Sequence, residues 1–389
     1  MEAYIIGGKR SAVAKAKRGG FKNYRSDDLA VDIIKNLVES IPGFDPLLVD
    51  DVIVGCANPE GEQGLQIGRN ISMRALGKSV PGFTINRYCA SGLEAISIAV
   101  AKITAGMGEC YIAGGTENMS MIPMTGYKMA PSYQAALENL NYHVSMGATA
   151  EAVGKKWNIT RQESDEFALR SHQLASAAIN EGKFKSEIVP IEVKEVFVNN
   201  NQRQEYSHTV DTDEGVRVDT SLEALGKLPA AFKNGGIVTA GNSSQTSDGA
   251  AFVLVMSDRL MKSLGLSPIA RLAACSVAGV DPLYMGIGPC AAIPKALKQS
   301  GLSLSDIGLI ELNEAFASQS LAVIKEAGLN PEITNVNGGA IALGHPLGCT
   351  GAKLTIQLLN EMKRRDEKYG LVTACVGGGQ GIAGIFERF

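Results

Sequence analysis

A cysteine at a strand-to-helix turn is the first feature of this sequence that could do chemistry. Residues 83–85 have the pattern of the end of a buried strand, and from Gly92 apolar residues recur at helical spacing. Cys89 therefore lies at or just before the first helical turn, where unpaired N–H groups and the helix dipole favour an anion. We expect this position to lower the pKa of Cys89 and make its thiolate a nucleophile. The alternative is that Cys89 is a small buried hydrophobic residue, as free cysteines usually are.

Three further side chains in the C-terminal third could assist a cysteine nucleophile in acyl transfer. His345 is one of four histidines and lies in a Gly-rich turn before Pro346. Cys375 ends an apolar run and precedes a Gly run, and Asn313 ends another apolar run. Each alone also has an ordinary structural explanation, as a hydrogen-bonded histidine, a core cysteine and a turn or cap residue.

Two other interpretations of these stretches are unfavourable. The spacing Gly379-x-Gly381-x-x-Gly384 matches a dinucleotide-binding pattern, but only five residues follow Gly384. They leave no room for the helix and the later acidic residue that such a site needs, so we expect a turn that presents N–H groups to an oxyanion. His345 and Cys349 are four residues apart, but Pro346 and Gly348 should break the helix that would place both on one metal ion. We expect no metal site.

The bulk composition restricts the class of protein. A chain of 389 residues should form two or three domains. The net charge of -3 and the lack of a long basic run argue against nucleic-acid binding. The number of cysteines is odd, at seven, and no two of them form a C-x-x-C motif. This favours a reducing compartment, and we expect the protein in the cytoplasm. The N-terminus lacks the pattern of a signal peptide and no apolar stretch is long enough to span a bilayer, so we expect no membrane insertion.

Strands and helices alternate along most of the chain, which predicts an α/β fold with a largely parallel sheet. Apolar runs predict strands at 4–7, 51–56, 83–85, 110–115, 250–255, 307–312 and 370–375. Helical periodicity predicts helices at 29–38, 70–76, from 92, and at 160–182, 258–264, 291–297 and 353–362. Residues 119–146 are irregular and 199–216 are polar and loop-like, so the middle of the chain has the character of an insertion. The order strand, turn, helix, strand that ends at residues 114–117 occurs again in the last third and ends at residues 377–380. This repeat resembles an internal duplication.

Four motifs together resemble those of the thiolases over essentially the whole chain. They are Asn86-Arg87-Tyr88-Cys89-Ala90-Ser91-Gly92, Asn313-Glu314-Ala315-Phe316, Gly344-His345-Pro346-Leu347-Gly348-Cys349-Thr350-Gly351 and Cys375-Val376-Gly377-Gly378-Gly379-Gln380-Gly381. The resemblance implies a duplicated, five-layered α-β-α-β-α fold with an inserted loop domain. The halves would be residues 1–118 plus 246–268 and residues 269–389, with the insertion at 119–245.

The resemblance also implies an acyltransferase with defined residue roles. Cys89 would carry the acyl group as a thioester, and His345 would activate Cys89 and later the thiol of coenzyme A. Cys375 would protonate the departing acetyl-CoA enolate. Asn313, through a water, would join His345 in one oxyanion hole, and the N–H groups of Cys89 and Gly377 would form the other.

Coenzyme A is implied as a co-substrate, with no permanently bound cofactor. Arg217 would lie near its adenine. The pantetheine tunnel would be lined by Ser244, Ala240, Phe232, Met146 and Phe316. Thiolases are homodimers or homotetramers, and either is expected here.

The substrate is expected to be a 3-ketoacyl-CoA. Residues 239–249 resemble the 3-ketoacyl-CoA thiolases of fatty-acid β-oxidation, and Ser145-Met146-Gly147 stands where acetoacetyl-CoA-specific relatives tend to carry His-Met-Gly. One alternative is an acetoacetyl-CoA thiolase that works in the condensing direction. A ketoacyl synthase would pair its cysteine with two histidines, where this chain offers Asn313 and Cys375. A non-catalytic acyl-CoA-binding protein would be expected to lose a reactive residue, and none is missing.

Overall fold

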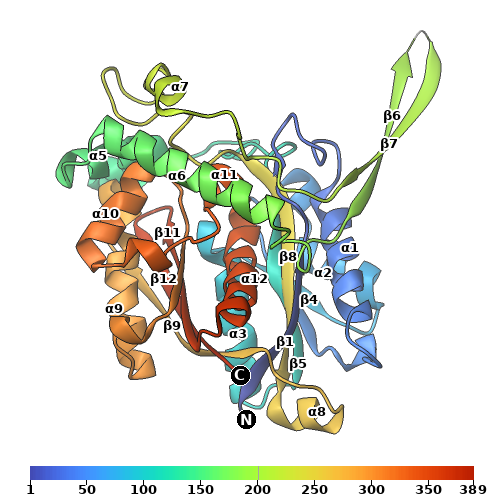
Figure 1. The fold of residues 1–389 in the computed structure, drawn as a ribbon. Coiled ribbons are helices and arrows are strands. Elements are labelled where there is room, and N and C mark those ends of the chain that lie inside the picture. The colour runs from blue at the N-terminus through green and yellow to red at the C-terminus, as the bar shows by residue number, and fades with distance from the viewer. Residues whose placement is uncertain (200) are drawn as a thin grey trace.

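Three layers of helices pack against one ten-stranded sheet, whose two halves, the N-terminal sheet and the C-terminal sheet, are seen edge-on in Figure 1. A computed structural model describes residues 1–199 and 201–389. The N-terminal sheet has the order β1-β8-β5-β3-β4 and the C-terminal sheet the order β9-β12-β11-β10. The sheets join where Ile5 of β1 pairs with Ala270 of β9. The strand bounds are β1 Ala3–Arg10, β3 Asp51–Gly55, β4 Gly82–Ile85, β5 Cys110–Asn118, β8 Ser247–Ser257, β9 Ala270–Gly279, β10 Leu309–Leu312, β11 Tyr369–Val376 and β12 Gln380–Arg388; the short β2, Ala14–Lys15, also pairs with β8.

The two sheets repeat one topology, as the expected duplication requires. In each, a first strand pairs antiparallel with a second, the second pairs antiparallel with a third, and the third pairs parallel with a fourth. The prediction of a largely parallel sheet was wrong, because only β3 with β4 and β5, and β10 with β11, run parallel. Strand β8 misled the prediction: it is antiparallel to its neighbours but buried along its whole length, so residues 250–256 are continuously apolar like a parallel strand.

Helices α3, Ser91–Thr104, and α12, Leu347–Arg365, form the layer between the sheets (Figure 1). Their first turns touch closely, because a Cβ at Gly92 would lie 2.6 Å from the backbone nitrogen of Ala352. A Cβ at Gly351 would likewise collide with the backbone nitrogen of Leu93. The prediction that Gly348 breaks the helix was wrong, since α12 already begins at Leu347. His345 nevertheless remains outside the helix.

Most helices of the outer layers agree with the sequence prediction, but no helix was predicted at Ala317–Ala327. Helices α1, Ser26–Glu39, and α2, Ile67–Leu76, cover the N-terminal sheet. Helices α9, Gly288–Ser300, and α10, Ala317–Ala327, cover the C-terminal sheet, and α8, Asp258–Ser263, follows β8. Of the helices described, none combines the length and apolar character needed to cross a bilayer.

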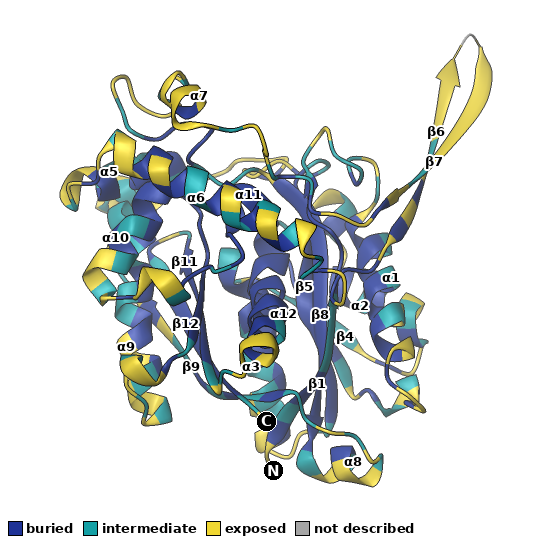
Figure 2. Ribbon diagram, viewed as in Figure 1, coloured by how far each residue is buried: buried dark blue, intermediate teal, exposed yellow. Residues whose placement is uncertain are grey.

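The region between β5 and β8 caps one end of the layers. It contains α4 Tyr133–Glu138, α5 Met146–Lys156, α6 Arg161–Asn180 and α7 Leu222–Gly226. The capping box predicted at Thr160 and Glu163 is present at the start of α6. The prediction of a loop at 199–216 was wrong for much of its length, because β7, Gln202–Val210, pairs with β6, Ile191–Asn199, in a hairpin. Figure 2 shows that this hairpin projects from the molecule with its outer part exposed. Ile191, Val193 and Val210 are buried at its base, but beyond them the strands lack the apolar alternation that would reveal them.

Candidate active site

The turn that carries Cys89 is strained and held by local hydrogen bonds. It is a 3₁₀ turn, Tyr88–Ala90, directly before α3. Tyr88 has a φ of 44°, a left-handed conformation that is unfavourable for a large side chain. Its N–H donates to Oδ1 of Asn86 at 2.8 Å, and its carbonyl accepts from the hydroxyl of Ser91 at 2.7 Å. These bonds fix the backbone that presents Cys89.

The electrostatics of Cys89 differ from the sequence prediction. Burial raises the pKa of Cys89 to about 12, and the N–H groups of Gly377 and of Cys89 itself lower it by less. The predicted donors are therefore directed at the thiol. The predicted net lowering was wrong, because desolvation of the thiolate outweighs those N–H groups. Cys89 is a protonated thiol near neutral pH.

His345 lies in the turn between α11, Ala340–Leu343, and α12, and is 5% exposed. Its Nε2 is 3.3 Å from Nδ2 of Asn313, and its Nδ1 is 2.5 Å from Oγ1 of Thr350. Burial, together with the positive charge of Lys353, lowers the pKa of His345 to about 3. The imidazole is therefore neutral and can act as a base.

Asn313 directly follows β10 and is fully buried, and its N–H donates to the carbonyl of Thr373 at 2.9 Å. The structure thus places Asn313 and His345 together, although they are 32 residues apart. Within the part of the chain that the structure describes, Oδ1 of Asn313 has no hydrogen-bond partner. A buried oxygen such as Oδ1 of Asn313 normally accepts a hydrogen bond, and a water or a substrate can supply the donor.

Cys375 is the last residue but one of strand β11 and is 1% exposed. Burial, and next the negative charge of an ionised Cys89, raise the pKa of Cys375. The two thiols are thus close enough to interact, and Cys375 keeps its proton more firmly than an ordinary cysteine. It is suited to hand over a proton in a reaction step.

Gly377 begins the turn between β11 and β12 and has side chains of the other half beside it. A Cβ on Gly377 would lie 3.5 Å from Cδ2 of Tyr88 and 3.6 Å from Sδ of Met146. Met146 also packs in one apolar cluster with Phe316 and Cys375. The structure therefore brings Met146 and Phe316 to Cys375.

The other predicted coenzyme A residues lie on the inserted region. Phe232 is 50% exposed and packs edge-on against Phe316, with ring centroids 6.2 Å apart. The N–H of Ser244 donates to the carbonyl of Ala315 at 3.0 Å, and Ala240 is exposed. Arg217 is exposed, and its N–H donates to Nδ1 of His172 at 3.2 Å. The position of Arg217 relative to an adenine stays a prediction.

Sequence reasoning missed Glu117, which binds the two halves together at the site. Its buried carboxylate accepts N–H groups of Ala57 at 2.7 Å and Gly348 at 2.9 Å, and the side-chain amide of Gln63 at 2.8 Å. Gly348 lies in the first turn of α12, directly after the turn of His345, and Ala57 lies in the N-terminal half, so Glu117 aligns the two. The only available signal was an acidic residue at the end of an apolar strand.

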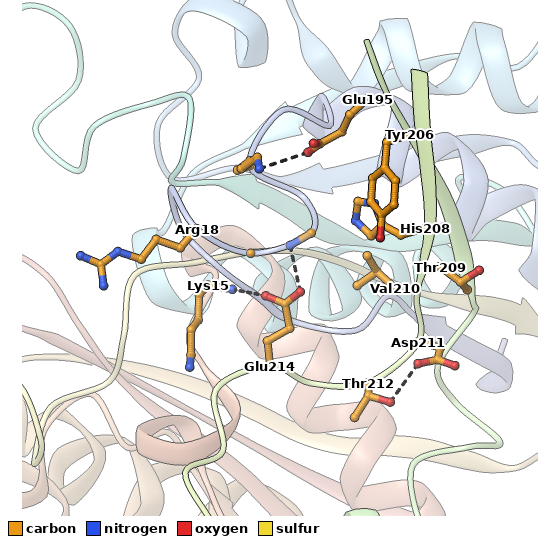
Figure 3. Close-up of a pocket in the computed structure, with 13 residues that line it drawn as sticks. Lys15, Arg18, Glu195, Tyr206, His208, Thr209, Val210, Asp211, Thr212 and Glu214 are labelled. Carbon is orange, nitrogen blue, oxygen red and sulfur yellow. Dashed lines mark hydrogen bonds and ion pairs between the residues drawn. The ribbon is translucent and has the colours of Figure 1, made fainter. Parts of the chain in front are cut away.

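A cavity of about 610 Å³ lies away from these groups, between residues 15–22 and the base of the β6–β7 hairpin. In Figure 3 the side chains of Lys15 and Arg18 point away from Tyr206 and His208 across the cavity. Glu214 accepts the N–H groups of Lys15 and Gly20, which occupies its carboxylate. The cavity contains none of the catalytic candidates, and two of its charged groups, Lys22 and Glu195, pair with each other at 3.3 Å.

Comparisons with known proteins agree with this geometry. Residues 3–259 match the family model described as thiolase, N-terminal domain, and residues 266–388 match thiolase, C-terminal domain. The chain is 51% identical to a 3-ketoacyl-CoA thiolase of Bacillus subtilis, over 99% of both chains. It is 44% identical to one of Chromohalobacter salexigens, over 99% of this chain and 97% of the relative.

Solved structures show the same fold. An acetyl-CoA acetyltransferase of Bacillus anthracis superposes with a TM-score of 0.89 at 40% identity, over 100% of this chain and 99% of that one. The human mitochondrial 3-ketoacyl-CoA thiolase gives 0.89 at 38% identity, over the same shares. The duplicated five-layered fold expected from the sequence is confirmed.

Proposed function

The chain belongs to the thiolase family and is an acyltransferase, and on this premise we propose that it cleaves a 3-ketoacyl-CoA with coenzyme A to acetyl-CoA and a shortened acyl-CoA. The observation that carries the proposal is the pair of thiols at the junction of the halves. Cys89 has N–H groups directed at it, and Cys375 lies close enough to feel its charge. One thiol can carry an acyl group while the other handles a proton.

The first half-reaction breaks the carbon–carbon bond. His345 accepts the proton of Cys89 as its sulfur attacks the keto carbon C3 of the substrate. The bond between C2 and C3 breaks, its electron pair passes into the acetyl-CoA enolate, and Cys375 protonates that enolate. Acyl-Cys89 remains, with a protonated His345 and the Cys375 thiolate.

The second half-reaction releases the acyl group. His345 passes the proton that it took from Cys89 to the Cys375 thiolate. His345 is then neutral again and can accept the proton of the coenzyme A thiol. That sulfur attacks the acyl thioester, and Cys89 leaves and takes the proton back from His345. Covalent capture thus divides one difficult reaction into two easier ones.

Two oxyanion holes would stabilise the charges that develop. The N–H groups of Cys89 and Gly377 would hold the oxygen of the tetrahedral intermediate. This role is supported by the direction of both N–H groups, which point toward the Cys89 thiol. Asn313 and His345 would hold the enolate oxygen, with a water on Asn313, and the unpartnered buried Oδ1 supports that role. Loss of one such donor typically costs about 3–4 kcal/mol.

Coenzyme A would bind as a co-substrate along the inserted region, with no permanently bound cofactor. The contacts among Met146, Phe316 and Phe232 support an apolar path to the thiols. Ser244, Ala240 and Arg217 would line its outer part. The insertion would span 119–245, between halves of 1–118 plus 246–268 and of 269–389.

The chain would form a homodimer or homotetramer in the cytoplasm. An exposed edge strand invites pairing with another strand, and β4 ends the N-terminal sheet. Large apolar side chains are exposed at Leu65, which precedes β4 in the sequence, and at Met129, Tyr133 and Leu140 of the inserted region. Exposed apolar side chains of this size are typical of surfaces that contact another protein. All seven cysteines are unpaired, which supports a reducing compartment. A place in fatty-acid β-oxidation would follow from the proposed substrate.

A product assay tests the proposal directly. The protein is supplied with coenzyme A and 3-ketoacyl-CoA substrates of increasing chain length, and acetyl-CoA and the shortened acyl-CoA are measured. Acetyl-CoA from the longer substrates is expected, and no product in either direction would refute the activity. Cleavage of acetoacetyl-CoA alone would favour the second candidate, an acetoacetyl-CoA thiolase, which the Bacillus anthracis neighbour makes worth testing.

A further inference from the structure

We propose that Thr350 is a positioning residue that holds His345 as the tautomer protonated at Nδ1, so that Nε2 is free to accept the proton of Cys89. The proposal rests on the proposed function, in which His345 is the base. Thr350 lies in the first turn of α12, five residues beyond His345 in the sequence. Both residues are nearly inaccessible, at 1% and 5% exposure, so solvent does not compete for their polar atoms.

The hydroxyl of Thr350 has two partners at hydrogen-bond distance. Its Oγ1 lies 2.5 Å from Nδ1 of His345 and 2.8 Å from the carbonyl oxygen of Pro346. A hydroxyl has a single hydrogen, and a carbonyl oxygen can only accept. When the hydrogen points to Pro346, only lone pairs face His345, and Nδ1 must supply the hydrogen of the short contact.

The opposite side of the ring leads to the same tautomer. Nε2 of His345 lies 3.3 Å from Nδ2 of Asn313, an amide nitrogen that only donates. A hydrogen on Nε2 would set two donors against each other, whereas a lone pair there accepts from Asn313. Independent contacts at the two ring nitrogens therefore place the hydrogen on Nδ1.

The opposite arrangement is the alternative that an experiment must distinguish. The carbonyl of Pro346 also accepts the N–H groups of Cys349 at 3.1 Å and Thr350 at 3.0 Å. The hydroxyl could then turn to donate to Nδ1, which would leave the hydrogen of the neutral ring on Nε2. His345 would then begin the reaction as a donor and could not take a proton from Cys89.

A hydroxyl partner also suits the repeated proton transfers that the proposed function requires. It orients the ring without adding a negative charge. A carboxylate in its place would stabilise the protonated ring and oppose its return to the neutral state. Thr350 thus fixes direction and tautomer while leaving His345 able to release the proton it has taken.

Two substitutions and one spectroscopic measurement test this role. Thr350→Val removes the hydroxyl at similar volume, and Thr350→Ser keeps it. We expect Thr350→Val to lower kcat by about 10–100-fold with little change in KM, as for other residues that orient a functional imidazole, and Thr350→Ser to retain most of kcat. Nitrogen-15 NMR of histidine-labelled protein, with His345 assigned by comparison with His345→Ala, reports the tautomer among only four histidines.

The wild type should show the hydrogen of His345 on Nδ1, and Thr350→Val should shift it toward Nε2. A hydrogen on Nε2 in the wild type, full kcat in folded Thr350→Val, or equal impairment in Thr350→Ser would overturn the proposal. The tautomer is measured without substrate. A wild type without thiolase activity would therefore refute the proposed function, whereas an Nε2 tautomer in an active wild type refutes only the role of Thr350.

Discussion

The thiol of Cys89 is subject to two opposing effects at the residue scale. N–H groups at the start of α3 and at Gly377 favour its thiolate, while loss of solvent disfavours it. Desolvation is the larger effect and raises the pKa of Cys89 to about 12, while burial lowers the pKa of His345 to about 3. These shifts favour the neutral form of both groups, so in the proposed mechanism proton transfer to His345 accompanies attack by the sulfur.

Alkylation of Cys89 tests that neutral state. A thiol whose pKa is raised to about 12 gains thiolate with every increase in pH across the neutral and alkaline range. Alkylation by iodoacetamide, followed at the Cys89 peptide by mass spectrometry, should therefore rise about tenfold per pH unit from pH ~6 to ~9. A rate that is already constant above about pH 7 would mean a preformed thiolate and would contradict the account.

The sequence singled out candidate residues, whereas its expectation for the electrostatics of Cys89 was wrong. Cys89, His345, Cys375 and Asn313 were proposed because chemically active residue types at strand and helix ends are recognisable in a pattern, and their roles stay predictions. Burial depends on which elements cover a residue, so the direction of the Cys89 pKa could not be read from its own segment. Glu117 was missed for the same reason, since its partners Ala57, Gln63 and Gly348 lie in three other segments.

At the element scale, the site depends on how closely α3 and α12 approach. Each helix begins directly after a catalytic candidate, Cys89 before α3 and His345 before α12. Gly92 and Gly351 allow their backbones to touch. The distance between the two turns is therefore set by the absence of two side chains.

Gly351→Ala should destabilise the protein by about 1–3 kcal/mol, because the added Cβ would overlap the backbone of Leu93. Alanine is otherwise the better helix former by about 1 kcal/mol, so a net loss reports the contact. Denaturant unfolding gives the free energy. The control is Gly226→Ala at the end of α7, where an added Cβ meets nothing within 4 Å. Equal stability of both variants would show that the helices can separate without cost.

Many elements with a buried face were predicted, but β9, β12, α5, α10 and the exposed hairpin were not. Helix α6 carries a capping box, α1 carries two acidic residues in its first turn, and both have apolar stripes that specify them locally. Strands β6 and β7 are held by pairing with each other, and much of both strands faces solvent. Alternating apolar residues are needed only where one face of a strand is buried. The outer part of the hairpin has no buried face, so its sequence does not need this pattern.

At the scale of the whole molecule, a buried ion cluster joins the inserted region to the first half. Arg10, at the end of β1, donates to both carboxylate oxygens of Asp213, at 2.7 Å and 2.9 Å, and to Glu187 at 2.8 Å. Glu187 also accepts from Asn360 of α12 at 2.9 Å. The cluster thus connects the insertion, the N-terminal sheet and the central helix layer.

Arg10→Met should lower the free energy of unfolding by about 3–5 kcal/mol, because it leaves two carboxylates buried without their cation. The matched control is Arg203→Met on the exposed hairpin, where Arg203 and its partner Glu205 are 70% and 61% exposed. That change should cost about 1 kcal/mol or less. Denaturant unfolding of both variants measures the difference, and similar losses would show that the buried cluster does not hold the insertion in place.

The central claim is that Cys89 carries the acyl group and Cys375 does not. The protein is mixed with acetyl-CoA without free coenzyme A and quenched in acid, and its peptides are analysed by mass spectrometry. The account predicts an acetyl group on the Cys89 peptide in the wild type and in Cys375→Ala, and none in Cys89→Ala. An acetyl group on Cys375, or unchanged labelling in Cys89→Ala, would contradict it.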